Sequence, residues 1–250
     1  MKCGAAYSGA MRVAVVADVH ANLEAFQAAL AHAGDVDEVW SLGDIVGYGP
    51  DPGACITLLH SYPHIAIAGN HDYAATGVIG MEEFNPFAAE AARWTATQLS
   101  LEDQLWLSNL SAVQIEGEFT LAHGSLNDPV WDYLVSLNAA RSHLEHQVTP
   151  YGLVGHSHLP HVYTEGQTGL REAGLADGEE VSLGKRRFVV NPGSVGQPRD
   201  GDPRAAYCLL DTEKRQLSFH RVAYDIELTQ AKMRAVGLPD YLAQRLEEGR

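Results

Sequence analysis

The sequence predicts an α/β fold, in which the short strands of a layered sheet alternate with helices along the chain. In the first 70 residues, short runs rich in valine and isoleucine alternate with segments whose apolar residues recur every three or four positions. In addition, polar residues that are able to bind metal follow these runs, at the places where strands are expected to end. Both observations are typical of a sheet that carries a ligand site along one edge.

The amino-terminal part of the chain contains the clearest elements. Residues 12–17 are rich in valine and predict a buried strand. Asn22 can cap a helix whose apolar residues recur from Leu23 onward, and Gly34 is expected to end that helix. Further strands are expected at residues 38–42 and 64–68, with a helix from about residue 53 to 60 between them.

The remainder of the chain predicts further helices and strands. Residues 81–110 are expected to be helical, because their apolar residues recur at three- and four-residue steps. Strands are expected at residues 112–115, 119–122, 151–154, 162–164, 187–190, 207–210 and 217–221. Helices are expected at residues 139–147 and from about residue 228, with a break at residues 237–239.

The organisation of the chain predicts one domain. No internal repeat, low-complexity tract or linker divides it, so a single domain is expected over residues 11–250. The segment Met1–Ala10 has no hydrophobic periodicity, which predicts a disordered leader and a translation start at Met11.

Composition limits the classes of partner. The chain has 32 acidic and 17 basic side chains, a formal net charge of −15, which argues against long nucleic acids and anionic membranes as partners. Cys3, Cys55 and Cys208 form no C-x-x-C pair, and no apolar run approaches the ~18 residues of a membrane span. A reduced, cytoplasmic protein is therefore expected. Whether it forms a homo-oligomer is left open.

Five polar clusters follow predicted strands. They are Asp18-Val19-His20, Gly43-Asp44, Gly69-Asn70-His71-Asp72, His123-Gly124 and Gly155-His156-Ser157-His158. Each cluster alone could be a turn or a helix cap, but five in succession are not explained by packing. Because the carboxyl ends of strands are where ligands bind in open α/β sheets, we expect one cleft to contain Asp18, His20, Asp44, Asn70, His123, His156 and His158.

These residue types favour a particular kind of metal site. Imidazole, carboxylate and amide oxygen suit manganese, iron, zinc or cobalt. Seven ligands are too many for one ion and fit two ions with a shared bridge, for which the two oxygens of Asp44 are suited. Two divalent ions ~3.5–4 Å apart can hold the attacking and leaving oxygens of an in-line displacement.

The motif set resembles the calcineurin-like metallophosphoesterase family, and in particular its small bacterial single-domain phosphodiesterase-type members. The matching motifs are D-x-H, GD, GNHD, HG and GH-x-H between Asp18 and His158, followed by the Asn191–Gly196 loop. The resemblance implies a four-layer α/β/β/α sandwich with a dinuclear metal site at the carboxyl ends of the strands. It also implies two divalent transition-metal ions, manganese foremost, with iron, zinc, cobalt or nickel as alternatives.

The resemblance also implies a role for each site residue. Asp18, His20 and His158 would hold the first metal, Asn70, His123 and His156 the second, and Asp44 would bridge them. His71 would act as the general acid for the leaving oxygen. Asp72 would orient His71, and the competing interpretation of Asp72 is a solvated helix-cap carboxylate.

The expected activity is hydrolysis of a phosphate ester by a metal-bound hydroxide. The substrate would be small and soluble, such as a nucleotide or a dinucleoside polyphosphate. No G-x-S-x-G motif and no cysteine beside a histidine offers another nucleophile. The alternative is a catalytically silent scaffold of the same fold that binds other proteins. Four loops are expected to select the substrate: residues 47–51, 73–86, 126–136 and 165–185.

A few other residues give weaker indications of a functional role. His143 and His146 flank Glu145 on a predicted helix, where a solvated face is expected. Trp131 and Tyr133 could shape a substrate pocket. Arg199 and Arg204 lie close to the Asn191–Gly196 loop and could bind phosphate, although ion pairs to Asp200 or Asp202 are the default expectation.

Overall fold

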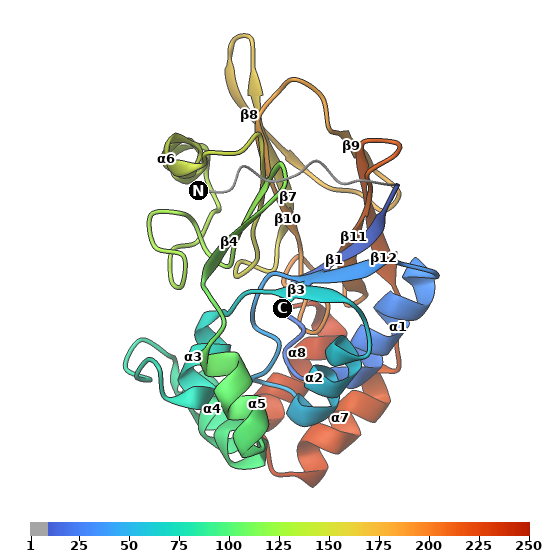
Figure 1. Ribbon diagram of the computed structural model, residues 1–250. Coiled ribbons are helices and arrows are strands. Elements are labelled where there is room, and N and C mark those ends of the chain that lie inside the picture. Colours follow the sequence, from blue (N-terminus) through green and yellow to red (C-terminus); the bar gives the residue numbers. More distant parts are fainter. Residues whose placement is uncertain (1–9) are drawn as a thin grey trace.

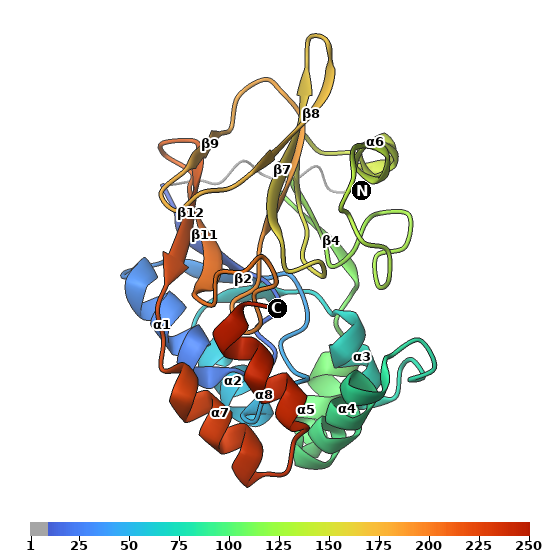
Figure 2. The same ribbon diagram turned by 180° about the vertical axis from the view of Figure 1, so that it is seen from behind.

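Two six-stranded sheets packed face to face form the centre of the structure, a computed structural model that describes residues 10–250. Helices cover the outer faces of both sheets (Figures 1 and 2). Nine of the ten residues of the expected leader Met1–Ala10 lie outside the described residues. Within the part of the chain that the structure describes, no helix is long and apolar enough to cross a membrane.

The first sheet has β1 at its centre, parallel to β2 and antiparallel to β11. The chain therefore leaves the carboxyl end of β1 in the middle of the sheet. The strand order is β3 (His64–Ala66), β2 (Glu38–Ser41), β1 (Arg12–Val16), β11 (Ala205–Asp211), β12 (Gln216–Val222) and β9 (Glu180–Ser182).

The second sheet has β5, β6 and β10 running parallel at its centre. The antiparallel hairpin of β7 and β8 forms one edge. The strand order is β4 (Val113–Glu116), β5 (Phe119–Ala122), β6 (Tyr151–Leu153), β10 (Phe188–Pro192), β7 (Pro160–Gly166) and β8 (Gly169–Gly174).

The helices separate into two groups. Both ribbon views show α6 beside the second sheet, apart from the helices at the opposite end of the molecule. The helices are α1 (Leu23–Ala33), α2 (Pro52–His60), α3 (Asn70–Thr76), α4 (Pro86–Gln98), α5 (Leu101–Ser108), α6 (Leu137–His146), α7 (Ile226–Ala235) and α8 (Asp240–Glu248).

Alternating side chains of β1 show how the layers are held together. Val13 and Val15 point into the core between the sheets, where Trp40 and Phe119 are buried. Ala14 and Val16 point the other way, into the core shared with α1 and α2. A further core lies between the second sheet and α6. The predicted four-layer α/β/β/α sandwich is therefore confirmed.

Some predicted elements differ from the observed ones. The helix expected over residues 81–110 is divided, because Ser100 caps a new helix by exchanging hydrogen bonds with Asp103. The GNHD segment forms the start of α3, which was not predicted. The loop expected at residues 165–185 contains the end of β7 and all of β8 and β9.

His143 on α6 is buried, and the expectation of a solvated face is wrong for this residue. Its Nδ1 accepts a hydrogen bond from the Leu126 backbone N–H at 3.1 Å, so the proton is on Nε2, 3.1 Å from Oε1 of Gln147. Burial lowers the pKa of His143 to about 4, so the folded protein holds this imidazole uncharged.

We expect this burial to make folding stability depend on pH. The unfolded chain takes up the His143 proton near its ordinary pKa of 6.5, whereas the folded protein resists it until about pH 4. The stabilising contribution of His143 to the free energy of unfolding is therefore complete above pH 6.5 and is lost as the pH falls towards 4. Between pH 7 and pH 5, the wild type should lose about 2 kcal/mol more free energy of unfolding than His143→Gln, measured by urea denaturation. Equal losses would contradict this role.

Candidate metal centre

Seven candidate ligands gather where strands of both sheets end. Asp18 and His20 follow β1, Asp44 follows β2, and Asn70 starts the helix after β3. The other three histidines come from the second sheet, where His123 follows β5 and the Gly-His-Ser-His segment follows β6. None of the seven is more than 4% exposed: Asp18, His20, Asp44, Asn70, His123, His156 and His158.

Asp18, His20 and His158 form one group, with one ligand atom of each within 4.8 Å of the others. The Nε2 atoms of His20 and His158 are 3.1 Å apart. The Nε2 of His158 also lies 3.4 Å from Oδ1 of Asp18. This is the set that the resemblance assigns to the first metal.

Asp44, His123 and His156 form a second group of the same size. Asn70 joins this group, with Oδ1 3.2 Å from Nε2 of His123. Asp44 lies between the groups, because its Oδ2 is 3.7 Å from Nε2 of His20 and 3.4 Å from Nε2 of His123. Its other oxygen, Oδ1, accepts the backbone N–H of His71 at 2.9 Å.

The outer nitrogen of each imidazole is already occupied by a backbone carbonyl. A carbonyl can only accept, so each of these nitrogens carries the proton and donates it. Nδ1 of His20 donates to the Val46 carbonyl at 3.3 Å, Nδ1 of His123 to the Leu42 carbonyl at 2.8 Å, and Nδ1 of His158 to the Gln197 carbonyl at 2.6 Å. Nε2 of His156 donates to the Trp131 carbonyl at 3.2 Å.

These outer bonds leave lone pairs on the inner nitrogens. The Nε2 atoms of His20 and His158 then face each other as acceptors in a buried site, which is unfavourable unless a cation lies between them. Outer carbonyls that fix imidazole tautomers are the usual support of metal-binding histidines. The residues present therefore fit divalent transition-metal ions.

Protons compete with cations for the same atoms. Burial raises the pKa of Asp18 to about 8. Burial disfavours the charged form of His123, but the Asp44 carboxylate outweighs it and raises the pKa of that ring to about 9. A metal ion that binds here must displace these protons, so metal affinity falls as the pH is lowered.

The backbone at the site is strained. Asp18, His20, Asp44, His156 and His158 all have φ between +49° and +66°, in the left-handed region. Each such residue costs on the order of 1–3 kcal/mol and persists only where the surroundings enforce it. Strain of this kind, at five of seven candidate ligands, is typical of a functional site.

The Asn191–Gly196 loop is one structure that enforces this backbone. It begins at the end of β10 and hydrogen-bonds the turn after β1. The backbone N–H of Val195 donates to the Ala17 carbonyl at 3.0 Å, and that of Gly196 donates to the Asp18 carbonyl at 3.0 Å. The Ser194 hydroxyl also donates to the Asp18 carbonyl, at 2.8 Å. The loop therefore fixes the D-x-H turn from the second sheet.

His71 lies beside the metal-ligand groups but makes different contacts. It forms a third close group with His20 and Asp44. Its ring is buried, and its Nδ1 has no hydrogen-bond partner among the described residues. That nitrogen lies against Gly47, where an added Cβ would be 2.5 Å from it. Burial lowers the pKa of His71 to about 4, although the Asp44 charge opposes this.

Asp72 makes no hydrogen bond to the His71 ring, so any orienting effect on His71 would not be through direct contact with the ring. Asp72 Oδ2 accepts the Gly69 backbone N–H at 2.9 Å, and Oδ1 accepts that of Val46 at 3.1 Å. The competing interpretation is half right, since Asp72 does cap α3 but is fully buried. Asp72 therefore joins the start of α3 to the loop after β2 instead of contacting the ring.

A cavity of about 70 Å³ opens beside the cluster. Three of the four loops expected to select the substrate line it, through Tyr48, Phe84, Trp131 and Tyr133, whereas residues 165–185 contribute none of its lining. Tyr48 and Phe84 were not singled out by the sequence analysis. The only signal for them was their position within the expected loops.

The two arginines near the Asn191–Gly196 loop make different contacts. Arg204 pairs with Asp202 at 2.7 Å and with Asp177 at 3.1 Å, so the default expectation is confirmed for it. Arg199 has no ion pair among residues 10–250 and lines the cavity. One of its Nη groups donates to Oε1 of Gln197 at 3.0 Å.

Three comparisons with known proteins bear on the family of this chain. The chain is 34% identical to an uncharacterised protein from Methanocaldococcus jannaschii over 95% of its length and 98% of that protein. It is 30% identical to a symmetrical bis(5'-nucleosyl)-tetraphosphatase from Glaesserella parasuis over 52% of this chain and 50% of that one. A metallophosphoesterase structure from Sphaerobacter thermophilus is 42% identical, with a TM-score of 0.89 over 97% of this chain and 100% of that one. Residues 11–215 match the calcineurin-like phosphoesterase superfamily domain, and the chain belongs to that family.

Proposed function

We propose that this protein hydrolyses phosphate esters of a small soluble substrate with the help of two divalent transition-metal ions. The observation that carries the proposal is the convergence of buried acceptors, in particular the two inner imidazole nitrogens 3.1 Å apart. Divalent ions held there would lower the pKa of water and neutralise charge on the phosphoryl group. The chain's own residues hold the ions, exclude bulk solvent and supply a proton.

His71 is proposed to supply that proton to the leaving oxygen. It lines the cavity, and its ring centroid is 4.9 Å from that of His20. With a pKa lowered to about 4 by burial, the ring holds a proton only when a nearby anion stabilises the charged form. A bound phosphate group is such an anion, so protonation of His71 is coupled to substrate binding.

Replacing His71 by alanine is expected to affect poor leaving groups most. Activity on an alkyl phosphate ester should fall by roughly 10²–10⁴-fold, while activity on a p-nitrophenyl ester falls far less, because nitrophenolate leaves without a proton. The measurement is kcat/KM for both esters in the wild type and in His71→Ala. Equal losses on both would exclude His71 from this role.

The direct test of the activity uses metal-stripped protein. Hydrolysis of bis-p-nitrophenyl phosphate and p-nitrophenyl phosphate is measured with and without added Mn²⁺. Metal-dependent turnover is expected, and the ratio of the two rates gives the preference for diesters or monoesters. Stoichiometric metal binding without turnover on any ester would instead favour the silent scaffold.

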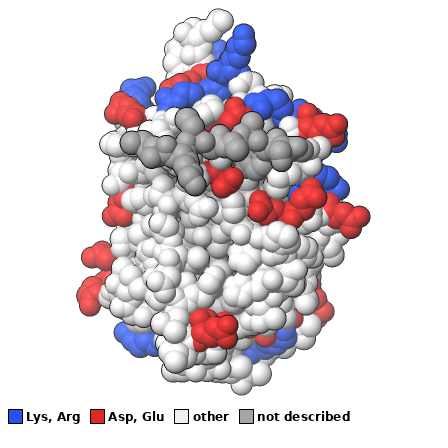
Figure 3. All heavy atoms as spheres, viewed as in Figure 1, with Lys and Arg blue, Asp and Glu red and all other residues white. Residues whose placement is uncertain are grey.

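The proposed substrate is a nucleotide or a dinucleoside polyphosphate. Four aromatic rings line the cavity, and aromatic rings can stack on a nucleobase. The tetraphosphatase relative acts, by its name, on such a molecule. On the face shown in Figure 3, Lys and Arg lie scattered among Asp and Glu and form no basic track for a long nucleic acid.

We also propose manganese as the foremost metal, the cytoplasm as the compartment, and one domain over residues 11–250. The metal ligands are Asp18, His20, Asp44, Asn70, His123, His156 and His158.

A further inference from the structure

Two arginines near the cavity stand apart from the other basic residues. Most described Lys and Arg side chains are either ion-paired or exposed to solvent. Within residues 10–250, only Arg199 and Arg245 are both partly shielded from solvent and free of an ion pair to an Asp or Glu side chain. In a chain with a net charge of −15, two shielded cations without an Asp or Glu partner require an explanation.

Arg199 lines the site and has unsatisfied donors. It lines the same cavity as His71, His156 and His158. Its Nε is buried and has no hydrogen-bond partner among the described residues. Gln197, which accepts its one hydrogen bond, also supplies the carbonyl that holds His158. The chain thus places this guanidinium next to the metal cluster but in contact with none of its carboxylates.

Arg245 approaches the same region from α8. Its Nε donates to a terminal carboxylate oxygen of Arg250 at 2.7 Å, and its guanidinium carbon lies 5.6 Å from the Tyr241 ring centroid. Burial and then the neighbouring Arg199 charge lower the pKa of Arg245. No hydrogen bond to either of its Nη groups exists in the described part of the chain.

We propose that Arg199, with Arg245 beside it, binds a phosphate group next to the scissile one, so that the substrate carries a chain of at least two phosphates. This inference rests on the proposed hydrolysis of phosphate esters. A guanidinium is suited to the task, because its planar set of donors matches phosphate oxygens in pairs.

Charge balance favours a second phosphate over the scissile one. The carboxylates of Asp18 and Asp44 offset half the charge of two divalent ions, and one phosphate group with the attacking water can balance the rest. Arg199 adds a positive charge that a single phosphate would leave uncompensated, because it has no ion pair among residues 10–250. Each further phosphate in a chain brings about one negative charge of its own.

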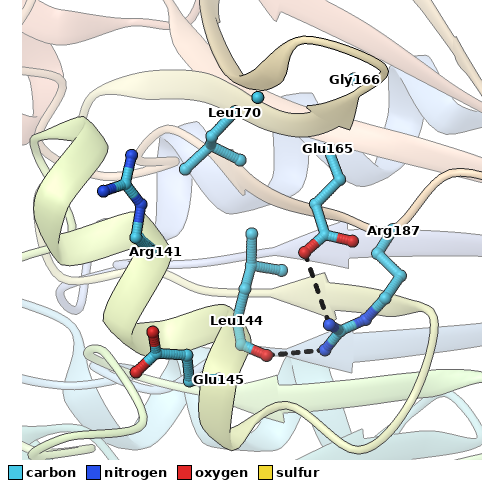
Figure 4. Close-up of a pocket in the computed structure, with 8 residues that line it drawn as sticks. Arg141, Leu144, Glu145, Glu165, Gly166, Leu170 and Arg187 are labelled. Atoms are coloured by element: carbon cyan, nitrogen blue, oxygen red, sulfur yellow. Dashed lines mark hydrogen bonds and ion pairs between the residues drawn. The ribbon is translucent and has the colours of Figure 1, made fainter.

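A second cavity of the molecule offers no comparable site. It has a volume of about 390 Å³ and lies between α6 and the hairpin of β7 and β8 (Figure 4). Its Arg187 is compensated, since it pairs with Glu165 at 3.5 Å and donates to the Leu144 carbonyl at 2.7 Å. Arg141 on its rim is exposed and serves as a matched control for the loss of one positive charge.

The test compares two substrates with the same leaving group. One is the p-nitrophenyl ester of a nucleoside 5'-monophosphate, and the other is the γ-p-nitrophenyl ester of the same nucleoside triphosphate. For Arg199→Ala we expect kcat/KM on the triphosphate ester to fall about 10- to 100-fold and on the monophosphate ester less than about threefold. Arg245→Ala should show a smaller loss of the same kind, and Arg141→Ala should show none.

A binding measurement separates this inference from the proposed activity. Calorimetry is carried out with methylenediphosphonate and methylphosphonate, which are not hydrolysed. It should show that Arg199→Ala weakens the binding of the diphosphonate only. Equal losses of kcat/KM on both esters, or of affinity for both phosphonates, would mean that Arg199 contacts the scissile group. Unchanged kcat/KM and affinity would mean that Arg199 does not bind the substrate. Either outcome overturns the inference. If no ester is hydrolysed but diphosphonate binding depends on Arg199, the proposed activity fails and the anion site stands.

Discussion

Replacing Asp44 by asparagine is expected to remove both metal ions and to lower kcat/KM roughly a thousandfold, equivalent to about 4 kcal/mol. One carboxylate oxygen accepts the His71 N–H at 2.9 Å, and the other faces Nε2 of both His20 and His123. An amide cannot satisfy both sides. If the amide oxygen accepts the His71 N–H, the NH₂ group points at Nε2 of His20 and of His123, where the carboxylate would face the metal ions.

The decisive measurement is metal content per chain, determined by elemental analysis after identical loading and desalting of the wild type and Asp44→Asn. Asp211→Asn, a change of the same kind at the far end of β11, is the control and should retain both ions. Loss of a single ion in Asp44→Asn would show that the bridge has been misassigned.

Replacing Gly196 by alanine is expected to cost about 3 kcal/mol of folding free energy and to disturb the metal centre at the same time. An added Cβ would lie 1.8 Å from the Val19 carbonyl oxygen and 2.6 Å from its carbonyl carbon. Backbone atoms cannot swing aside as a flexible side chain can, so the loop must separate from the D-x-H turn. The hydrogen bond from the Gly196 N–H to the Asp18 carbonyl would be lost with it.

Urea unfolding of metal-loaded and metal-stripped protein would check both parts of this expectation. Gly174→Ala is the matched control, because an added Cβ at that position meets nothing within 4 Å. If Gly196→Ala proved as stable as Gly174→Ala and kept its metal, the loop would not be needed to fix the turn after β1.

Much of the site could be predicted because its side chains lie directly after strands. One cluster such as Asp18-Val19-His20 could be a turn or a helix cap, but five in succession after strands are not explained by packing, and the order of strands brings them to one edge. The supports of the imidazoles could not be predicted in the same way. They are backbone carbonyls of Val46, Leu42, Trp131 and Gln197, and a carbonyl carries no signal in the sequence.

The differences between sequence and structure have similar physical causes. His143 was expected on a solvated face, but α6 turns this residue inward, where Gln147 and the Leu126 N–H satisfy it. Arg199 and Arg204 have the same acidic neighbours in the sequence. Only the path of the loop decides that Arg204 reaches Asp202 while Arg199 turns into the cavity.

The left-handed backbone at five of the candidate ligands has a consequence for how the centre is assembled. Contacts of the folded chain, such as those of the Asn191–Gly196 loop to Asp18, help to hold these conformations. The fold, and not the ions alone, therefore sets the positions of these five residues. Ions that differ in their preferred geometry would then meet the same arrangement of ligands, so the fold itself would select among them.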